Sequence, residues 1–190
     1  MHYVFISGIP ASGKSFLAKK IAVKTTAFHL DIDTLREELT KDPKLAPWVN
    51  FYWDLDEKKY LTETPCEELW LNLVKQSEAF WPVIVKKIQE IRNTYQSAIF
   101  ETVNILPHLA ARDLDFPGIF LLGESLEQII ERNKMNPRWG KTEELQRLEA
   151  EVYFNCERVT YKREAEKYGF KTFANSEEAE SELIRLLEKM

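Results

Sequence analysis

The segment Gly8–Ser15, with the sequence GIPASGKS, constrains the fold of this chain more than any other feature. It matches the spacing GxxxxGK[ST], and it lies between a short β-rich run, Tyr3–Ser7, and a segment with helical apolar spacing, Lys14–Thr25. Glycines at both ends of such a loop let the backbone wrap a phosphate closely, and its N–H groups and the helix N-terminus attract negative charge. A chance match is the alternative, but the flanking strand and helix favour a phosphate-binding loop.

Two side chains of this loop carry the expected chemistry. Lys14 can bridge the β- and γ-phosphates of a nucleotide, and the Ser15 hydroxyl can coordinate Mg²⁺. We therefore expect Lys14 to be catalytic and Ser15 to be a metal ligand. The predicted nucleotide-binding residues are Gly8, Ile9, Pro10, Ala11, Ser12, Gly13, Lys14, Ser15 and Phe16.

Strand-like and helix-like segments alternate along the chain, which indicates an α/β fold with a parallel sheet covered by helices. We expect one doubly wound domain over residues 1–190. An aromatic, proline-containing stretch at about 41–65 is predicted to be a partly helical insertion, and a polar stretch at about 133–142 a lid loop. The expected strands are Tyr3–Ser7, Ala27–Asp31, Ser97–Glu101, Gly118–Leu122 and Phe170–Ala174.

Several helices carry local signals. Asp33 is a plausible N-cap for a helix over Thr34–Leu39. Pro82 should kink or divide the helical segment Glu67–Asn93. The segment Thr142–Tyr168 is expected to be one long helix. Its apolar stripe is predicted to be Leu145, Leu148, Val152, Cys156 and Val159.

Composition excludes several classes of protein. An apolar fraction of 44% supports one packed core, and a net charge of −5 argues against broad coating of nucleic acid. Apolar runs are too short to span a bilayer, and Gly8 and Pro10 interrupt the first one, which is not typical of a signal peptide. Cys66 and Cys156 are too few for a disulfide scaffold. We expect a cytoplasmic domain in a reducing compartment.

Two acidic residues follow the second expected strand. Asp31 and Asp33 are two residues apart, so strand alternation points them to the same side, at the carboxyl end where ligands of open α/β sheets bind. One can hold Mg²⁺ through water and the other can accept a proton from an attacking hydroxyl. Arg36, one turn on, suits a substrate phosphate or carboxylate, or else a surface ion pair.

Four further residues complete the expected site. Glu101 ends the third strand, where it can bind substrate or take the Mg²⁺–water role, and Asn104 can add a substrate hydrogen bond. Arg132 and Arg138 bracket the loop after the fourth helix. An arginine there can close on the phosphates of a bound nucleotide. It can instead cap the carboxyl end of the helix or pair with Glu131. For Arg138 we favour the catalytic role. The insertion's aromatic residues can wall an acceptor pocket or cover the sheet edge.

Together, GIPASGKS, His29–Arg36, Phe100–Thr102 and the arginine-bearing lid resemble the small P-loop kinases of the nucleoside-monophosphate-kinase and shikimate-kinase group. The chain looks most similar to zeta-toxin-like small-molecule phosphotransferases. The resemblance implies sheet order 2-3-1-4-5, with ATP and Mg²⁺ as cofactors. It implies that Asp33 activates the acceptor hydroxyl, Asp31 binds metal through water, and Arg132 packs against adenine. In that group glycine is common where this chain has Ala11.

The resemblance leaves the acceptor open. We expect ATP-dependent phosphorylation of a hydroxyl on a small metabolite or nucleotide-type substrate. A nucleoside-monophosphate kinase, in which Arg36 would hold an acceptor phosphate, is one alternative. A regulatory nucleotide-binding module or slow ATPase is another. A polynucleotide 5′-kinase is disfavoured by the net charge of −5.

Overall fold

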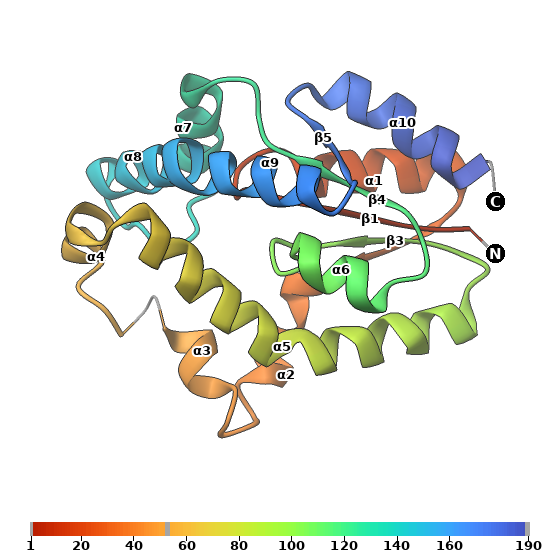
Figure 1. Cartoon of the computed structure of the whole chain (residues 1–190), viewed down its shortest axis with the longest axis horizontal. Coiled ribbons are helices and arrows are strands. Elements are labelled where there is room, and N and C mark those ends of the chain that lie inside the picture. The colour runs from red at the N-terminus through yellow and green to blue at the C-terminus, as the bar shows by residue number, and fades with distance from the viewer. Residues whose placement is uncertain (1, 52–53, 189–190) are drawn as a thin grey trace.

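A computed structural model of the chain describes residues 2–51 and 54–188. At its centre lies a five-stranded sheet in the order β2-β3-β1-β4-β5, and every pairing of neighbouring strands is parallel. Figure 1 shows helices on both sides of this sheet. The predicted α/β fold and strand order are confirmed. The strands are β1 (His2–Gly8), β2 (Phe28–Asp31), β3 (Ser97–Glu101), β4 (Gly118–Leu121) and β5 (Lys171–Phe173).

Alternating residues of β1 build the two halves of the core, because successive side chains of a strand point to opposite faces. Val4 and Ile6 pack in a cluster with residues of α1 (Lys14–Thr25) and α10 (Ser176–Glu188). Tyr3 and Phe5 belong to the larger cluster on the other face. That cluster involves α5 (Cys66–Thr94), α6 (Pro107–Asp113), α7 (Leu126–Met135), α8 (Glu143–Val152) and α9 (Arg158–Lys167).

The helix α5 runs through Pro82 as one element. Its ribbon nevertheless changes direction part-way along (Figure 1). Proline removes one backbone donor and its ring crowds the preceding turn, so a bend is the expected result. The predicted kink is confirmed, and a second helix does not begin there.

The long helix expected over Thr142–Tyr168 is interrupted by a π-helix, η2 (Tyr153–Glu157), between α8 and α9. A π-turn adds one residue to the helical repeat and rotates every later side chain relative to the earlier ones. Val159, placed in the apolar stripe by regular spacing, is therefore 57% exposed, and Tyr161 and Ala165 are buried instead. The predicted stripe is wrong beyond the π-turn.

The N-cap prediction for Asp33 is also wrong. Residues Ile32–Leu35 form a 3-10 turn, η1, ahead of the short helix α2 (Arg36–Leu39). The side chain of Asp31 caps that turn by accepting a hydrogen bond from the Asp33 backbone N–H at 3.1 Å. The Asp33 carboxylate is therefore left for other partners.

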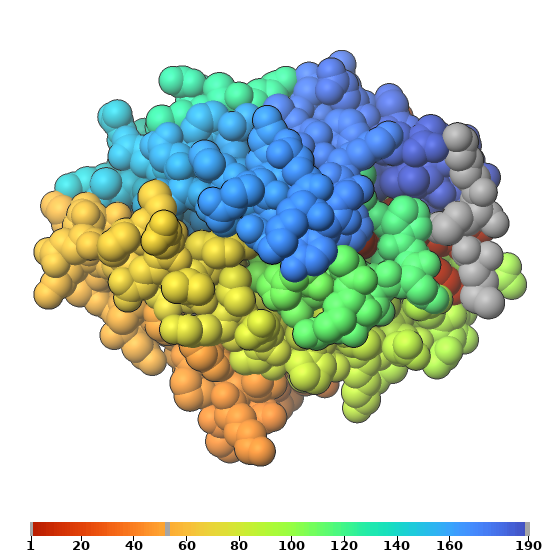
Figure 2. All heavy atoms as spheres, in the orientation of Figure 1, coloured from red at the N-terminus to blue at the C-terminus, as the bar shows by residue number. Residues whose placement is uncertain are grey.

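The predicted insertion contains two short helices, α3 (Ala46–Asn50) and α4 (Glu57–Glu63). In Figure 2 the orange part of the chain projects beside the yellow-green surface of α5. Trp48 packs against the larger core cluster. Tyr52 and Trp53, which belong to the same aromatic stretch, lie outside the described residues.

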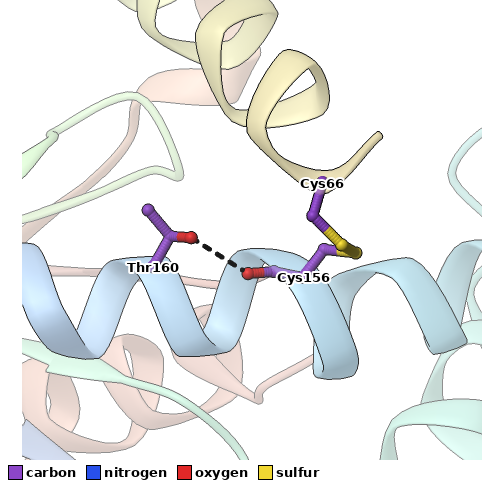
Figure 3. The surroundings of a disulfide bond; sticks show 3 residues. All are labelled: Cys66, Cys156 and Thr160. Carbon is purple, nitrogen blue, oxygen red and sulfur yellow. Dashed lines mark hydrogen bonds between the residues drawn. A yellow bond between two sulfur atoms is a disulfide. The ribbon is translucent and has the colours of Figure 1, made fainter. Parts of the chain in front are cut away.

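Cys66 and Cys156 form a disulfide, which the sequence did not lead us to expect. The bond joins the first residue of α5 to the π-helix η2, with Cα atoms 5.1 Å apart (Figure 3). Disulfides are uncommon in reducing compartments, so the cytoplasmic location stays a prediction. In the part of the chain that the structure describes, none of the helices has the length and apolar character needed to cross a membrane.

We predict that reducing this disulfide destabilises the fold, because the bond closes a loop with a sequence separation of 90. Loss of such a cross-link typically costs about 2–5 kcal/mol, mainly by enlarging the unfolded ensemble. Thermal unfolding with and without dithiothreitol measures the effect as a fall in Tm. Cys66→Ser should melt at the Tm of the reduced wild type, and dithiothreitol should not change its Tm. Equal Tm values for oxidised and fully reduced wild type would contradict the prediction.

Candidate functional site

The phosphate-binding loop lies at the carboxyl end of the central strand β1, as predicted. Gly8 has φ 122°, and a Cβ there would lie 2.1 Å from the carbonyl oxygen of Leu121, so only glycine fits. Gly13 has φ 100°. Ala11 also adopts a left-handed backbone, with φ 55°, which is the region glycine enters without strain. The loop therefore keeps a glycine-type conformation even where the residue is alanine.

Lys14 is buried with 5% of its surface exposed. Its Nζ donates a hydrogen bond to the carbonyl oxygen of Ile9 at 2.7 Å, which holds the ammonium group inside the loop. Burial lowers the pKa of Lys14 to about 8, against the opposing effect of the nearby carboxylates of Glu101 and Asp33. A desolvated ammonium of this kind gains most from an anionic partner.

A cavity of about 620 Å³ extends over the loop. Among its lining residues are Lys14, Ser15 and Phe16 from the loop side, and Asp31, Asp33 and Glu101 from the ends of β2 and β3. Arg132 closes this cavity from α7, where its Nη1 donates to the carbonyl oxygen of Ser12 at 2.6 Å. The predicted nucleotide-binding residues that line this cavity are Ala11, Gly13, Lys14, Ser15, Phe16 and Arg132, whereas Pro10 lines the second cavity described below.

The metal-binding residues predicted from sequence lie at one corner of this cavity. The Ser15 hydroxyl donates to Oε1 of Glu101 at 3.0 Å. Oε2 of Glu101 is buried and has no donor among the described residues. Burial, and then the charges of Glu101 and Asp33, raise the pKa of Asp31. Although Lys14, Arg138 and His29 lie near these carboxylates, the concentration of oxygen atoms suits a divalent cation.

The described residues contain no group of three or more His, Cys, Asp or Glu side chains that could hold a metal ion alone. Mg²⁺ usually keeps several waters and binds through one or two protein ligands together with substrate phosphates. Ser15, Asp31 and Glu101 therefore fit Mg²⁺ as a partner of bound nucleotide. Glu101, which we predicted as a substrate-binding residue, lines the nucleotide side and not the second cavity described next.

A second cavity, narrow at about 40 Å³, lies between the strand ends and α5. Its walls are mainly apolar, with Leu73, Phe80 and Ile84 contributed by α5. Its polar lining residues are Asp33, Arg36, Gln76, Asn104, Arg138 and Glu157. Apolar walls with a few polar groups are typical of small-molecule sites, although this space is smaller than the roughly 300–1,000 Å³ of most of them. We call it the acceptor cavity, after the role proposed below.

Asp33 and Arg138 line both cavities. Oδ2 of Asp33 accepts a hydrogen bond from Nη2 of Arg138 at 2.8 Å, and Oδ1 accepts from the Thr102 hydroxyl at 2.8 Å. The lid arginine therefore reaches the carboxylate of Asp33, a contact that we did not predict from the sequence. The pair therefore lies where the two cavities adjoin.

Arg36 and Asn104, which we predicted to bind substrate, both line the acceptor cavity. Nη2 of Arg36 donates to the carbonyl oxygen of Val49 at 2.8 Å, which ties the cavity wall to the insertion. Asn104 is 8% exposed, and its Nδ2 donates to the hydroxyl of Ser77 on α5 at 2.9 Å. The described insertion aromatics, Trp48, Phe51 and Tyr60, are not among the lining residues of this cavity.

Sequence reasoning missed Glu157, which lines the acceptor cavity from the end of the π-helix η2. Its Oε2 is buried without a hydrogen-bond donor among the described residues. Burial raises the pKa of Glu157 to about 7, although the positive charges of Arg138 and Lys14 favour ionisation. A π-turn is often found at functional sites, but regular helical spacing gives no sign of one in the sequence.

No protein-family model and no curated protein sequence matches this chain. Among solved structures, shikimate kinase from Acinetobacter baumannii in complex with shikimate matches with a TM-score of 0.54 and 11% identity, over 99% of this chain and 93% of that one. Deoxyadenosine kinase from M. mycoides with bound dATP matches with a TM-score of 0.51 and 16% identity, over 100% of both chains. At such identities the likeness establishes the fold that P-loop kinases share.

We predict that Thr102→Val destabilises the fold by about 1–3 kcal/mol, because the change leaves buried groups unpaired. The Thr102 hydroxyl donates to Asp33 and accepts from the backbone N–H of Asn104 at 3.1 Å. Valine keeps the shape but supplies neither bond. Urea unfolding measures the loss, and Thr102→Ser should retain most of the stability. A valine variant as stable as wild type would show that these bonds contribute nothing.

Proposed function

We propose that this chain is an ATP-dependent phosphotransferase that moves the γ-phosphate of ATP to a hydroxyl group of a small acceptor. The observation that carries the proposal is the position of Asp33 and Arg138 at the junction of the two cavities. The P-loop kinase fold supports the same reading, since nucleotide and shikimate kinases share it. The specific likeness to zeta-toxin-like phosphotransferases stays a prediction.

In the proposed reaction the loop holds the phosphates and Asp33 acts on the acceptor. The acceptor oxygen forms a bond to the γ-phosphorus, its proton passes to the carboxylate of Asp33, and the bond from the γ-phosphorus to the bridging oxygen breaks to release ADP. Thr102 and Arg138 orient the carboxylate. Arg138 and Lys14 offset the charge of the transferring group. Mg²⁺, held near Ser15 and Asp31, would neutralise phosphate charge.

The acceptor cavity limits the size and polarity of the acceptor. A compact molecule with an apolar face suits the walls of α5, and its polar groups can reach Arg36, Asn104 or Glu157. A guanidinium in such a cavity also favours an anionic substituent on the acceptor. For that reason a nucleoside monophosphate remains a second candidate, in which Arg36 would contact the acceptor phosphate.

The test of the proposal is ADP formation from Mg·ATP with a panel of nucleoside monophosphates, nucleosides, sugars, nucleotide sugars, shikimate-like acids and aminoglycoside or phenicol alcohols. Lys14→Ala is the blank. One acceptor class should stimulate turnover well above this blank. If ATP binds and water-dependent phosphate release is the only activity, the chain is a slow ATPase or regulatory module and the proposal fails.

With an active acceptor, we predict that Asp33→Asn lowers kcat by about 10²–10⁴-fold, because asparagine cannot take the proton. The affinity for ATP, measured by calorimetry, should stay near that of the wild type, since the loop is unchanged. Turnover close to that of the wild type would remove Asp33 as the base.

We also predict which of two variants is the more damaging. If the acceptor presents a hydroxyl, Arg36→Ala should raise KM more than it lowers kcat, and Asp33→Asn should lower kcat more. A nucleoside-monophosphate acceptor needs no base, because its phosphate is already an anion. In that case Arg36→Ala would be the more damaging change, which steady-state kinetics of the two variants would show.

A further inference from the structure

The lid loop is fixed by a buried carboxylate outside both cavities. Glu149, on α8, has no exposed surface. Its Oε1 accepts a hydrogen bond from the backbone N–H of Gly140 at 3.1 Å, and its Oε2 accepts from Nδ2 of Asn133 at 2.7 Å. Asn133 lies in the last turn of α7, before Arg138, and Gly140 follows Arg138 by two residues. Glu149 thus holds the loop on both sides of the arginine.

Gln146, one turn earlier on α8, reinforces the same arrangement. Its Nε2 donates to the carbonyl oxygen of Gly140 at 3.0 Å, and its own carbonyl oxygen accepts from Nδ2 of Asn133 at 2.8 Å. Gly140 also packs closely on α8, since a Cβ there would lie 2.9 Å from the backbone nitrogen of Gln146. The lid loop is therefore fastened to α8, and its position depends on Glu149.

The insertion reaches the same carboxylate through Glu57, the first residue of α4. The negative charge of Glu149 acts on the nearby carboxyl group of Glu57 and favours a hydrogen bond shared between them, and the Lys58–Glu144 ion pair holds α4 against α8 beside them. Oε1 of Glu57 is buried and has no N–H or O–H donor among the described residues. Two carboxyl groups can share a hydrogen bond only if one of them carries a proton. Because both oxygens of Glu149 already accept from N–H groups, the proton belongs to Glu57.

We propose that Glu149 is a positioning residue for the catalytic lid and that a proton on Glu57 fastens the insertion to it. The proposal rests on the proposed function only in what it says of catalysis. The lid geometry and the shared proton can be tested without an acceptor. The functional consequence is that Arg138 stays at Asp33 as long as the three elements remain joined.

The surroundings of Glu57 and Glu149 explain why Glu57 keeps its proton near neutral pH. Burial, and then the negative charge of Glu149, raise the pKa of Glu57 to about 7. Glu157 and Tyr153 of η2 line the same small cavity as Glu57, and the Lys58–Glu144 ion pair joins α4 to α8 nearby. Because the pKa is raised on folding, the contact is complete at acidic pH and is lost as the pH rises through about 7.

Hydrogen exchange at the Gly140 amide, followed by NMR, reports the bond to Glu149 directly. Glu149→Gln places an amide donor against one of two N–H donors. We therefore expect exchange at the Gly140 amide to accelerate at least tenfold at pH 6, which corresponds to about 1.4 kcal/mol. The matched control is Glu151→Gln, on the same helix, where the carboxylate pairs only with Arg147 among the described residues. In this control, the Gly140 amide should exchange at the wild-type rate.

A second variant tests the proton. Glu57→Gln carries a permanent N–H donor and mimics the protonated acid. In wild type, exchange at Gly140 relative to its intrinsic rate should rise several-fold between pH 6 and pH 8, and in Glu57→Gln it should not change. The Glu57 variant keeps the proposal testable if Glu149→Gln fails to fold.

Equal Gly140 exchange in wild type and Glu149→Gln would overturn the positioning role. A pH response in Glu57→Gln like that of wild type, or none in wild type, would overturn the shared proton. With an active acceptor, Glu149→Gln should lower kcat with unchanged ATP affinity. A normal kcat together with a loosened loop would show that the lid position does not matter for transfer, without bearing on whether the chain is a kinase.

Discussion

The ion pair between Asp33 and Arg138 is the contact on which the arrangement of the site depends. It joins the end of β2 to the lid, 105 residues later in the chain, and Thr102 adds the end of β3 to the same carboxylate. A carboxylate that accepts from a guanidinium and a hydroxyl has a fixed orientation. Because the pair lines both cavities, the lid and the sheet would act on the same reacting group in the proposed transfer.

The charges around this pair suit an anionic ligand. Lys14 is desolvated, and within the described structure its Nζ donates to a carbonyl oxygen. Such an ammonium gains an opposite charge when a phosphate binds. Glu157 and Arg138 are partly buried nearby, so each charge in the site depends on the others. Loss of one member leaves its partner unpaired, which is costly in a dry interior.

Most of the sheet and the phosphate-binding loop can be predicted from the sequence, because both have local signals. The glycines, Lys14 and Ser15 occur at fixed spacing, and the strands are short apolar runs. The clustering of Asp31, Asp33 and Glu101 follows from the rule that the carboxyl ends of parallel strands meet at one edge. In these parts of the chain, the local sequence signals agree with the tertiary structure.

The remaining features have no local signal. The π-turn at Tyr153–Glu157 changes the helical phase, so regular spacing misplaced Val159 and concealed Glu157. The cap belongs to Asp31 because a 3-10 turn begins at Ile32, two residues before the predicted start of the helix at Thr34. The contacts of Glu149 with Glu57 and Gly140, like the disulfide, join segments that sequence periodicity cannot bring together.

The central claim is that the nucleotide's γ-phosphate meets the acceptor at Asp33 and Arg138. A crystal structure of the protein with Mg²⁺ and a non-hydrolysable ATP analogue tests it most directly. The account predicts triphosphate density along Gly8–Ser15, the metal beside Ser15 and Asp31, and the γ-phosphate facing Asp33 and Arg138, with the acceptor cavity beyond. Nucleotide bound elsewhere, or a γ-phosphate turned away from Asp33, would contradict it.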